Sequence, residues 1–241
     1  MSDPANVTNV ANGTPSDEAR ALEAELVREA IRLHERYTVE IVEGYDVCPW
    51  ARHARLAGEV DRAVLLQRDE ALEPTLSLLD RLEADPRCLP VAIAIYPRLA
   101  LDPPAFDRFA QRLRDADQKR HGGKPVYVSA SFHPEYRLDL RSPASLVPFL
   151  RRSPDPSLQL VRLSVIEEAR GKSHSGTFVF DFSPAAWDEL RRRAASPPIA
   201  ERIAADNLRT VEREGIEAFE AKLRAIAEDR ARSYVRFTDL P

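Results

Sequence analysis

The chain has 241 residues, 44% of them hydrophobic and 31% charged, with a formal net charge of −4. This length is enough for one domain with a sizeable core. The mildly acidic balance gives no reason to expect nucleic acid or an anionic membrane surface as a partner, and no run of residues approaches the roughly 20 apolar positions of a membrane-spanning helix.

The cysteines and the N-terminal residues bear on where the protein works. Cys48 and Cys88 are too few for a disulfide framework and lack the spacing of a zinc ribbon, which favours a reducing, cytoplasmic location. Residues 1–15 are polar, unlike a signal peptide. We expect them to form a disordered leader before one domain over residues 16–241.

A long amphipathic helix is predicted at the start of this domain. Ser16 is the expected N-cap, and apolar residues recur at helical spacing over residues 22–42. Gly44 suits the end of the helix. Pro49 suits the first position of the next helix, which would make Cys48 its N-cap.

Three stretches predict strands in the first two thirds of the chain. Residues 59–67 mix β-branched and apolar residues, and residues 126–133 alternate between apolar and polar. Residues 90–96 form a nearly continuous apolar run bounded by prolines, which is typical of a strand buried on both faces.

Helical patterns separate these strands. Residues 69–85 carry leucines on one face, and Asp102 is placed to cap a helix that begins at Pro103 and ends at residues 122–123. Strand, helix and strand in this order predict a crossover unit. We therefore expect an α/β fold, with α+β as the alternative, built on a central sheet of about four strands flanked by helices.

The remaining third gives a mixed signal. Ser142-Pro143 and Ser153-Pro154 are candidate starts of helices or turns, while residues 157–170 fit a helix and a strand equally well. Residues 177–182 alternate as a strand does, and a helix is expected from Ser183-Pro184 onwards. The C-terminal part is predicted to be helical, with a break at Gly215.

Cys48 is the first candidate for chemistry. A thiol at a helix N-terminus meets unpaired N–H groups and the positive end of the helix dipole, which favour the thiolate. Arg52 follows about one turn later and adds positive charge. The alternative is an inert, buried cysteine, which is how most free cysteines behave.

Other polar residues are weaker candidates. His133 stands at the end of a predicted strand, where α/β folds often place their sites, although it could equally bond its local turn. Arg151, Arg152 and Arg162 offer guanidinium groups that suit a carboxylate or a phosphate. The alternative is a solvated face, which we favour for Arg151. The five histidines show no metal-ligand spacing, which leaves open a site assembled from distant residues.

Three separated stretches carry a resemblance to a known family, and they are Val47-Cys48-Pro49-Trp50-Ala51-Arg52, Ser131-Phe132-His133-Pro134-Glu135-Tyr136 and Arg152-Ser153-Pro154-Asp155-Pro156-Ser157-Leu158-Gln159-Leu160-Val161-Arg162. In order and spacing they resemble the motifs of the bacterial DUF1415 family, a domain of unknown function. The likeness covers roughly residues 22–170, so residues 16–170 are expected to be the family-like core. Residues 171–241 would then add a strand and a helical C-terminal extension.

The resemblance implies a shared polar set and supplies no activity. The set consists of Cys48, Arg52, His133, Arg152, Ser153 and Arg162. The segment between the second and third motifs departs from the family pattern, because the stretch from Arg141-Ser142-Pro143 to Arg151 replaces an acidic loop.

The leading hypothesis is an enzyme that acts on a small anionic molecule. Cys48 would be the thiolate nucleophile or redox centre and His133 the acid–base group. The anion would bind to Arg52, Arg152, Ser153 and Arg162. One alternative is a metal- or haem-binding protein that uses Cys48 and His133 as ligands, and another is a non-catalytic interaction domain. The sequence assigns no cofactor, no metal ligand and no oligomeric state.

Overall fold

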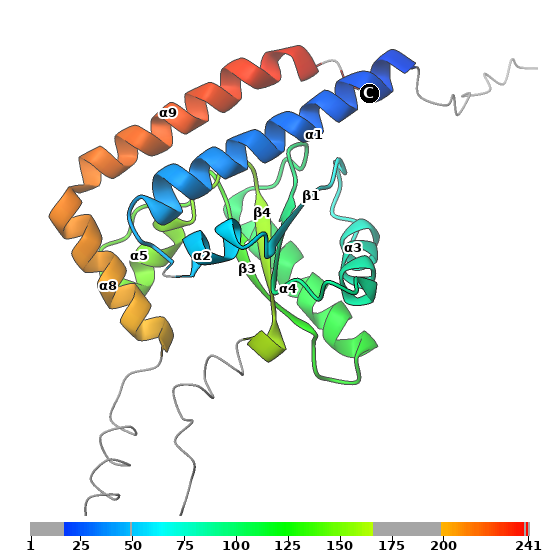
Figure 1. Cartoon of the computed structure of the whole chain (residues 1–241). Coiled ribbons are helices and arrows are strands. Elements are labelled where there is room, and N and C mark those ends of the chain that lie inside the picture. The colour runs from blue at the N-terminus through cyan, green and yellow to red at the C-terminus, as the bar shows by residue number, and fades with distance from the viewer. Residues whose placement is uncertain (1–16, 49, 166–198, 239, 241) are drawn as a thin grey trace, which may run out of the picture.

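The computed structural model describes residues 17–48, 50–165, 199–238 and 240, and these form a mixed α/β fold (Figure 1). The expected leader (1–15), strand (177–182) and helix from Ser183 lie outside the described residues. No helix within these described ranges is long and apolar enough to cross a membrane.

A four-stranded sheet lies at the centre, in the order β1-β2-β4-β3. Its strands are β1 (Val60–Val64), β2 (Val91–Ile95), β3 (Tyr127–Phe132) and β4 (Ser157–Arg162). β1 pairs with β2 in parallel, whereas β4 is antiparallel to both β2 and β3. The three strands predicted from the first two thirds of the chain are confirmed, and the ambiguous stretch after residue 157 begins as a strand.

Two crossovers build the parallel part of this sheet. Helix α3 (Glu73–Ala84) joins β1 to β2, and helix α4 (Pro103–Arg120) joins β2 to β3. Because β2 and β3 are each antiparallel to β4, they are parallel to one another. The Asp102 carboxylate accepts a hydrogen bond from the Ala105 N–H at 2.7 Å, so the predicted cap of α4 is confirmed.

The two faces of the sheet bury different sets of side chains. On β2, Ala92 and Ala94 belong to the core that α3 and α4 cover, while Ile93 and Ile95 pack against Ala30 of helix α1 (Asp17–Tyr37). This alternation is what a strand buried on both faces requires.

Helix α1 runs antiparallel to α9 (Ile216–Tyr234) on the same side of the sheet (Figure 1). Asp229 of α9 accepts hydrogen bonds from Arg32 at 3.0 Å and from Arg36 at 2.7 Å, both on α1. These bonds lower the pKa of Asp229 to about 2. The two helices are therefore joined by charge as well as by apolar contact.

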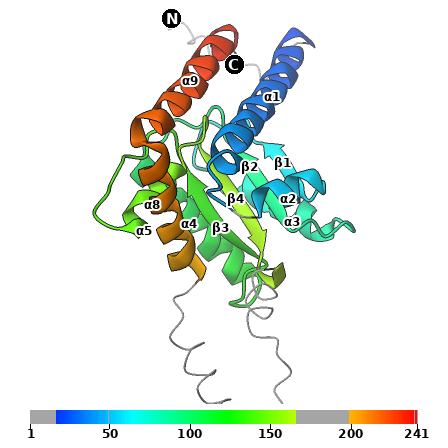
Figure 2. The ribbon, with the colours of Figure 1, turned by 60° about the vertical axis from the view of Figure 1, so that its left-hand side comes forward.

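A second core lies beside the sheet, where α5 (Pro143–Leu150) meets α8 (Ile199–Glu214) (Figure 2). Ser142 caps α5 by accepting from the Ser145 N–H at 3.1 Å. Gly215, at φ 87°, separates α8 from α9, which confirms the predicted break; the 3₁₀ turn η2 (Val235–Phe237) follows α9. The buried side chains of this second core are Tyr37, Ile41, Tyr45, Leu146, Phe149, Leu150, Val211, Phe219, Leu223 and Ile226.

The start of the second helix differs from the prediction. Helix α2 (Ala51–Leu56) has Trp50 as its N-cap, so Cys48 lies in the preceding turn and is not the cap. Its carbonyl accepts a hydrogen bond from the Ala51 N–H at 3.1 Å. Pro49 itself is outside the described residues.

A π-helix, η1 (Thr38–Glu43), leads from α1 into this turn. Gly44 follows it, and a Cβ at this position would lie 2.4 Å from the Glu40 carbonyl oxygen. That separation is too short for any side chain, so the close approach requires glycine.

Gly44→Ala is therefore expected to lower the free energy of unfolding by about 2 kcal/mol or more, because backbone must move to admit the methyl group. Urea denaturation measures this loss. Gly122→Ala is the comparison, since Gly122 has φ +64° but nothing within 4 Å of its would-be Cβ. Its cost should be that of the backbone conformation alone, about 1 kcal/mol. A smaller loss for Gly44→Ala than for Gly122→Ala would contradict the steric argument.

Candidate functional site

Arg151 lies where the end of α5 meets the end of β3. Its guanidinium carbon is 5.5 Å from the centre of the Phe132 ring, and the side chain is half-buried. Burial lowers the pKa of Arg151 below its ordinary value. Among the described residues, no group forms a hydrogen bond or a salt bridge with this guanidinium. The expectation of a solvated Arg151 is wrong, because the turn after α5 directs the side chain inward.

Polar groups from four other parts of the chain interact electrostatically with Arg151. Its charge interacts with Cys48, Tyr37, Tyr136 and Asp107. The Tyr136 hydroxyl donates to Asp107 Oδ1 at 2.5 Å, and Asp107 belongs to the first turns of α4. Burial and the Asp107 carboxylate raise the pKa of Tyr136, so the phenol keeps its proton. We define the Arg151 corner as Arg151, Cys48, Asp107 and Tyr136.

Cys48 brings a thiol to this corner. Burial raises the pKa of Cys48 above its ordinary value. The N–H groups of Trp50 and Ala51 and the charge of Arg151 act in the opposite direction but are weaker. The predicted attraction between the thiolate and helix N–H groups therefore exists, and desolvation exceeds it.

The ring of His133 forms hydrogen bonds with backbone groups. Its Nε2–H donates to the Leu101 carbonyl at 2.9 Å, and its Nδ1 accepts from the Glu135 N–H at 3.2 Å. The side chain is 2% exposed and packs against the ring of Phe106. Both ring nitrogens are occupied, so in this arrangement neither is available to exchange a proton with a substrate.

Arg152 and Ser153 likewise bond to nearby backbone. Arg152 donates from Nε to the Pro134 carbonyl at 3.1 Å, and its guanidinium lies over the Phe149 ring. Ser153 is buried and donates to the Asp155 carbonyl at 2.5 Å. These bonds hold the turn between α5 and β4.

Arg162 lies at the other end of β4. It donates to the Leu89 carbonyl at 3.1 Å and to the Leu82 carbonyl at 2.7 Å. In the antiparallel pairing, Arg162 is opposite Tyr127, whereas Phe132 is opposite Ser157. Five residues of strand, about 17 Å, therefore separate Arg162 from the Arg151 corner.

Arg52 belongs to an ionic link that spans the Cys48 turn. Glu43, at the end of η1, accepts from Arg55 of α2 at 2.6 and 2.9 Å, while the more exposed Arg52 lies 3.6 Å away. The Glu43 side chain is only 3% exposed. Hydrogen bonds from Arg55 hold the pKa of Glu43 below its ordinary value.

The structure thus brings together a different set from the one predicted. Cys48 is at the Arg151 corner, whereas His133, Arg152 and Arg162 bond to backbone groups. Asp107 and Tyr136 were not among the residues predicted from the sequence, and Arg151 was expected on a solvated face. Tyr136 lies inside one of the three motifs, which was the only signal for it.

A comparison with protein-family models matches residues 29–180 to a model described as "Protein of unknown function (DUF1415)". The matched range contains all three motifs and extends to residue 180, into the stretch expected to be an added strand. No curated protein and no solved structure matches the chain.

Glu43→Gln is expected to lower the free energy of unfolding by about 1–3 kcal/mol, because it removes a buried, charge-assisted pair of hydrogen bonds. Since the folded-state pKa of Glu43 is lowered, this contribution is present above the ordinary carboxyl pKa of about 4.3 and disappears as the pH falls below it. Urea denaturation at several pH values measures it. Glu40→Gln, which breaks a more exposed pair with Arg36, should cost less than about 1 kcal/mol. Equal losses for the two variants would argue against a special role of Glu43.

Iodoacetamide at neutral pH is expected to label the exposed Cys88 well before Cys48, because burial keeps Cys48 protonated and the thiolate is the reactive form. Mass spectrometry of the digested protein gives both rates. In concentrated urea the two rates should converge. Faster labelling of Cys48 in the folded protein would show that its thiolate is favoured after all.

Proposed function

The chain belongs to the DUF1415 family, and we propose that it binds a small anionic molecule at Arg151, with the thiol of Cys48 beside the bound molecule. The single observation that carries this proposal is the half-buried guanidinium of Arg151, which has no hydrogen bond or salt bridge within the described part of the chain. His133, Arg152 and Arg162 have no part in it.

Burying a cation without a partner costs free energy, so a fold tends to retain one only where it has another use. The planar fork of an arginine matches carboxylates and phosphates and binds them through two parallel hydrogen bonds. The Phe132 ring supports one side of Arg151. An anion arriving from solvent would therefore complete the site.

The proposed role of Cys48 is to react with the bound molecule, which would make the protein an enzyme. Its thiolate would be the nucleophile, and the hydrogen-bonded pair of Tyr136 and Asp107 would supply acid–base chemistry. Because burial raises the pKa of Cys48, a reaction through its thiolate should become faster as the pH rises.

Two other functions find less support. A metal or haem site with His133 as ligand would have to break the bonds of that ring to the Leu101 carbonyl and the Glu135 N–H. A non-catalytic interaction domain would use the exposed Trp50 and Leu56 next to Cys48. Cys48→Ala separates this last alternative from catalysis. In an interaction domain the substitution would lower the free energy of unfolding and have no other effect, whereas in an enzyme it would leave a stable, inactive protein.

Arg151→Met is expected to weaken binding of inorganic phosphate or of small dicarboxylates, measured by isothermal titration calorimetry, by at least about tenfold. The free energy of unfolding should stay within about 1 kcal/mol of the wild-type value or rise, because methionine removes an unpaired buried charge. Arg141→Met is the matched control, since Arg141 is exposed and pairs with Asp139. It makes the same change in net charge and should leave binding unaltered.

A second readout uses the two cysteines. A bound anion should slow alkylation of Cys48 and leave Cys88 unchanged. If Arg151→Met destabilises the protein and anions bind it as tightly as wild type, Arg151 is structural and the proposal fails. It also fails if no anion in the panel binds.

A further inference from the structure

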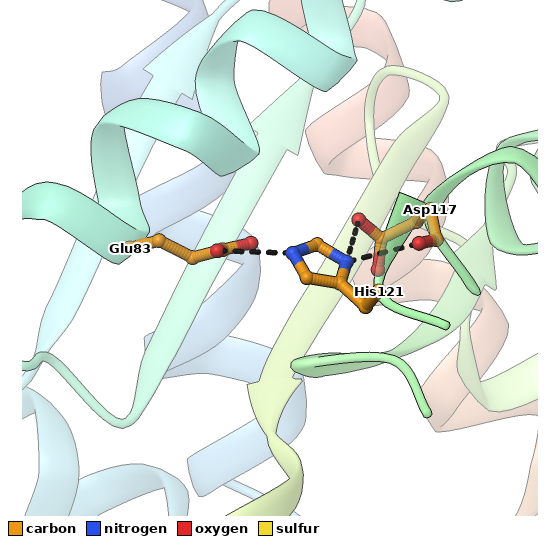
Figure 3. A group of neighbouring side chains, drawn as sticks. All are labelled: Glu83, Asp117 and His121. Carbon is orange, nitrogen blue, oxygen red and sulfur yellow. Dashed lines mark hydrogen bonds and ion pairs between the residues drawn. The ribbon is translucent and has the colours of Figure 1, made fainter. Parts of the chain in front are cut away.

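The C-terminal ends of α3 and α4 bring three ligand-type side chains together, far from the Arg151 corner in the fold. They are Glu83 on α3, and Asp117 and His121 at the end of α4, with Asp117 one turn before His121 (Figure 3). Their nearest ligand atoms all lie within 4.8 Å of one another. The sequence shows only the Asp117–His121 spacing, because Glu83 comes from another helix.

The orientation of the His121 ring is set by the backbone. Its Nδ1 lies 2.9 Å from the Asp117 carbonyl oxygen, so Nδ1–H donates there. That leaves Nε2 directed at Glu83 Oε2, 3.1 Å away (Figure 3). Histidines that bind metals commonly donate one ring N–H to a carbonyl or carboxylate and bind the ion with the other nitrogen.

The two carboxylates have unsatisfied oxygens in this cluster. Asp117 is 2% exposed, and its Oδ1 lies 3.3 Å from His121 Nδ1 without forming a hydrogen bond. Glu83 Oε1 is also buried without a hydrogen-bond partner. Among the described residues, Arg120 is a rival cation: it lies 3.6 Å from Asp117 Oδ1 but pairs more closely with Asp80, at 2.6 Å. Buried carboxylate oxygens without a hydrogen-bond partner are stabilised when a cation binds to them.

We propose that Glu83, Asp117 and His121 bind a divalent transition-metal ion of the Zn²⁺ class, through His121 Nε2 and one oxygen from each carboxylate. Two ligands of one Zn²⁺, each about 2 Å from it, lie about 3–3.5 Å apart. The ligand atoms now lie up to 4.8 Å apart, so the ion would draw the carboxylates closer, and the Asp117 carboxylate, 3.3 Å from Nδ1, would turn toward the Nε2 side. The Glu83 and His121 side chains are 25% and 24% exposed, so the ion enters from solvent. Once bound, it ties the ends of α3 and α4 together.

The rival arrangement is a protonated His121 held between two carboxylates, with no affinity for metal. Titration calorimetry with Zn²⁺ separates the two. His121→Gln and Glu83→Gln should each weaken Zn²⁺ binding by at least about tenfold. Glu73→Gln, which removes an exposed carboxylate from the first turn of the same helix α3, should leave it unchanged. Circular dichroism of each variant checks that the fold is retained.

Thiols also bind Zn²⁺, so the Cys48→Ser/Cys88→Ser double variant is needed, and it should retain wild-type affinity. Loss of binding in that variant would place the ion at a cysteine and overturn the proposal. So would Zn²⁺ affinities that are equal in wild type, His121→Gln and Glu83→Gln, or a wild-type protein that takes up no Zn²⁺ at millimolar concentration.

Discussion

Asp155 carries a carboxylate with no solvent exposure, and the geometry of the Arg151 corner depends on how this charge is satisfied. One oxygen accepts from Arg230 Nε at 2.6 Å and the other from the Tyr234 hydroxyl at 2.7 Å, both on α9. Burial still raises the pKa of Asp155, since desolvation exceeds what these partners return. A buried charge that loses its partner costs about 3–5 kcal/mol, so removing Arg230 would strongly destabilise the contact between α9 and the segment that leads into β4.

This anchor fixes the turn that presents Arg151. The Arg151 carbonyl accepts from the N–H groups of both His133 and Ser153, each at 3.0 Å. The Ser153 hydroxyl in turn donates to the Asp155 carbonyl and accepts from Ser157. The backbone on both sides of Arg151 is thus held by buried hydrogen bonds, while its guanidinium forms no hydrogen bond or salt bridge with any residue that the structure describes. A rigid backbone with an unsatisfied charged side chain is preorganised for a ligand, because little further ordering is needed on binding.

The elements could be predicted from the sequence where the signal was local. Asp102 followed by prolines, the alternation over residues 126–133 and the apolar run over residues 90–96 each fix a cap or a strand within a few residues. The stretch from residue 157 could not be decided, because its few apolar positions fit both periods. Yet this stretch becomes β4, which inserts between β2 and β3 and so sets the order of the whole sheet.

The candidate site depends on that order, which is why sequence reasoning placed it only in part. Cys48 was found because its turn carries a local signal. The direction of its pKa shift could not be predicted in the same way. The N–H groups can be anticipated from a helix start, but desolvation depends on what packs above the thiol. Asp107 and Tyr136 meet only after α4 has crossed to β3. The π-helix ahead of Cys48 has no local signal beyond Gly44.

Three of the motif residues, His133, Arg152 and Arg162, each donate to backbone carbonyls. In this arrangement the three side chains satisfy backbone carbonyl groups. That leaves Cys48 and Arg151, whose charges are coupled, since Arg151 favours the thiolate. An anion paired with Arg151 would cancel this help. If Arg151 binds an anion as proposed, a reaction at Cys48 needs the bound molecule to place an electrophilic atom, not its charge, against the sulfur.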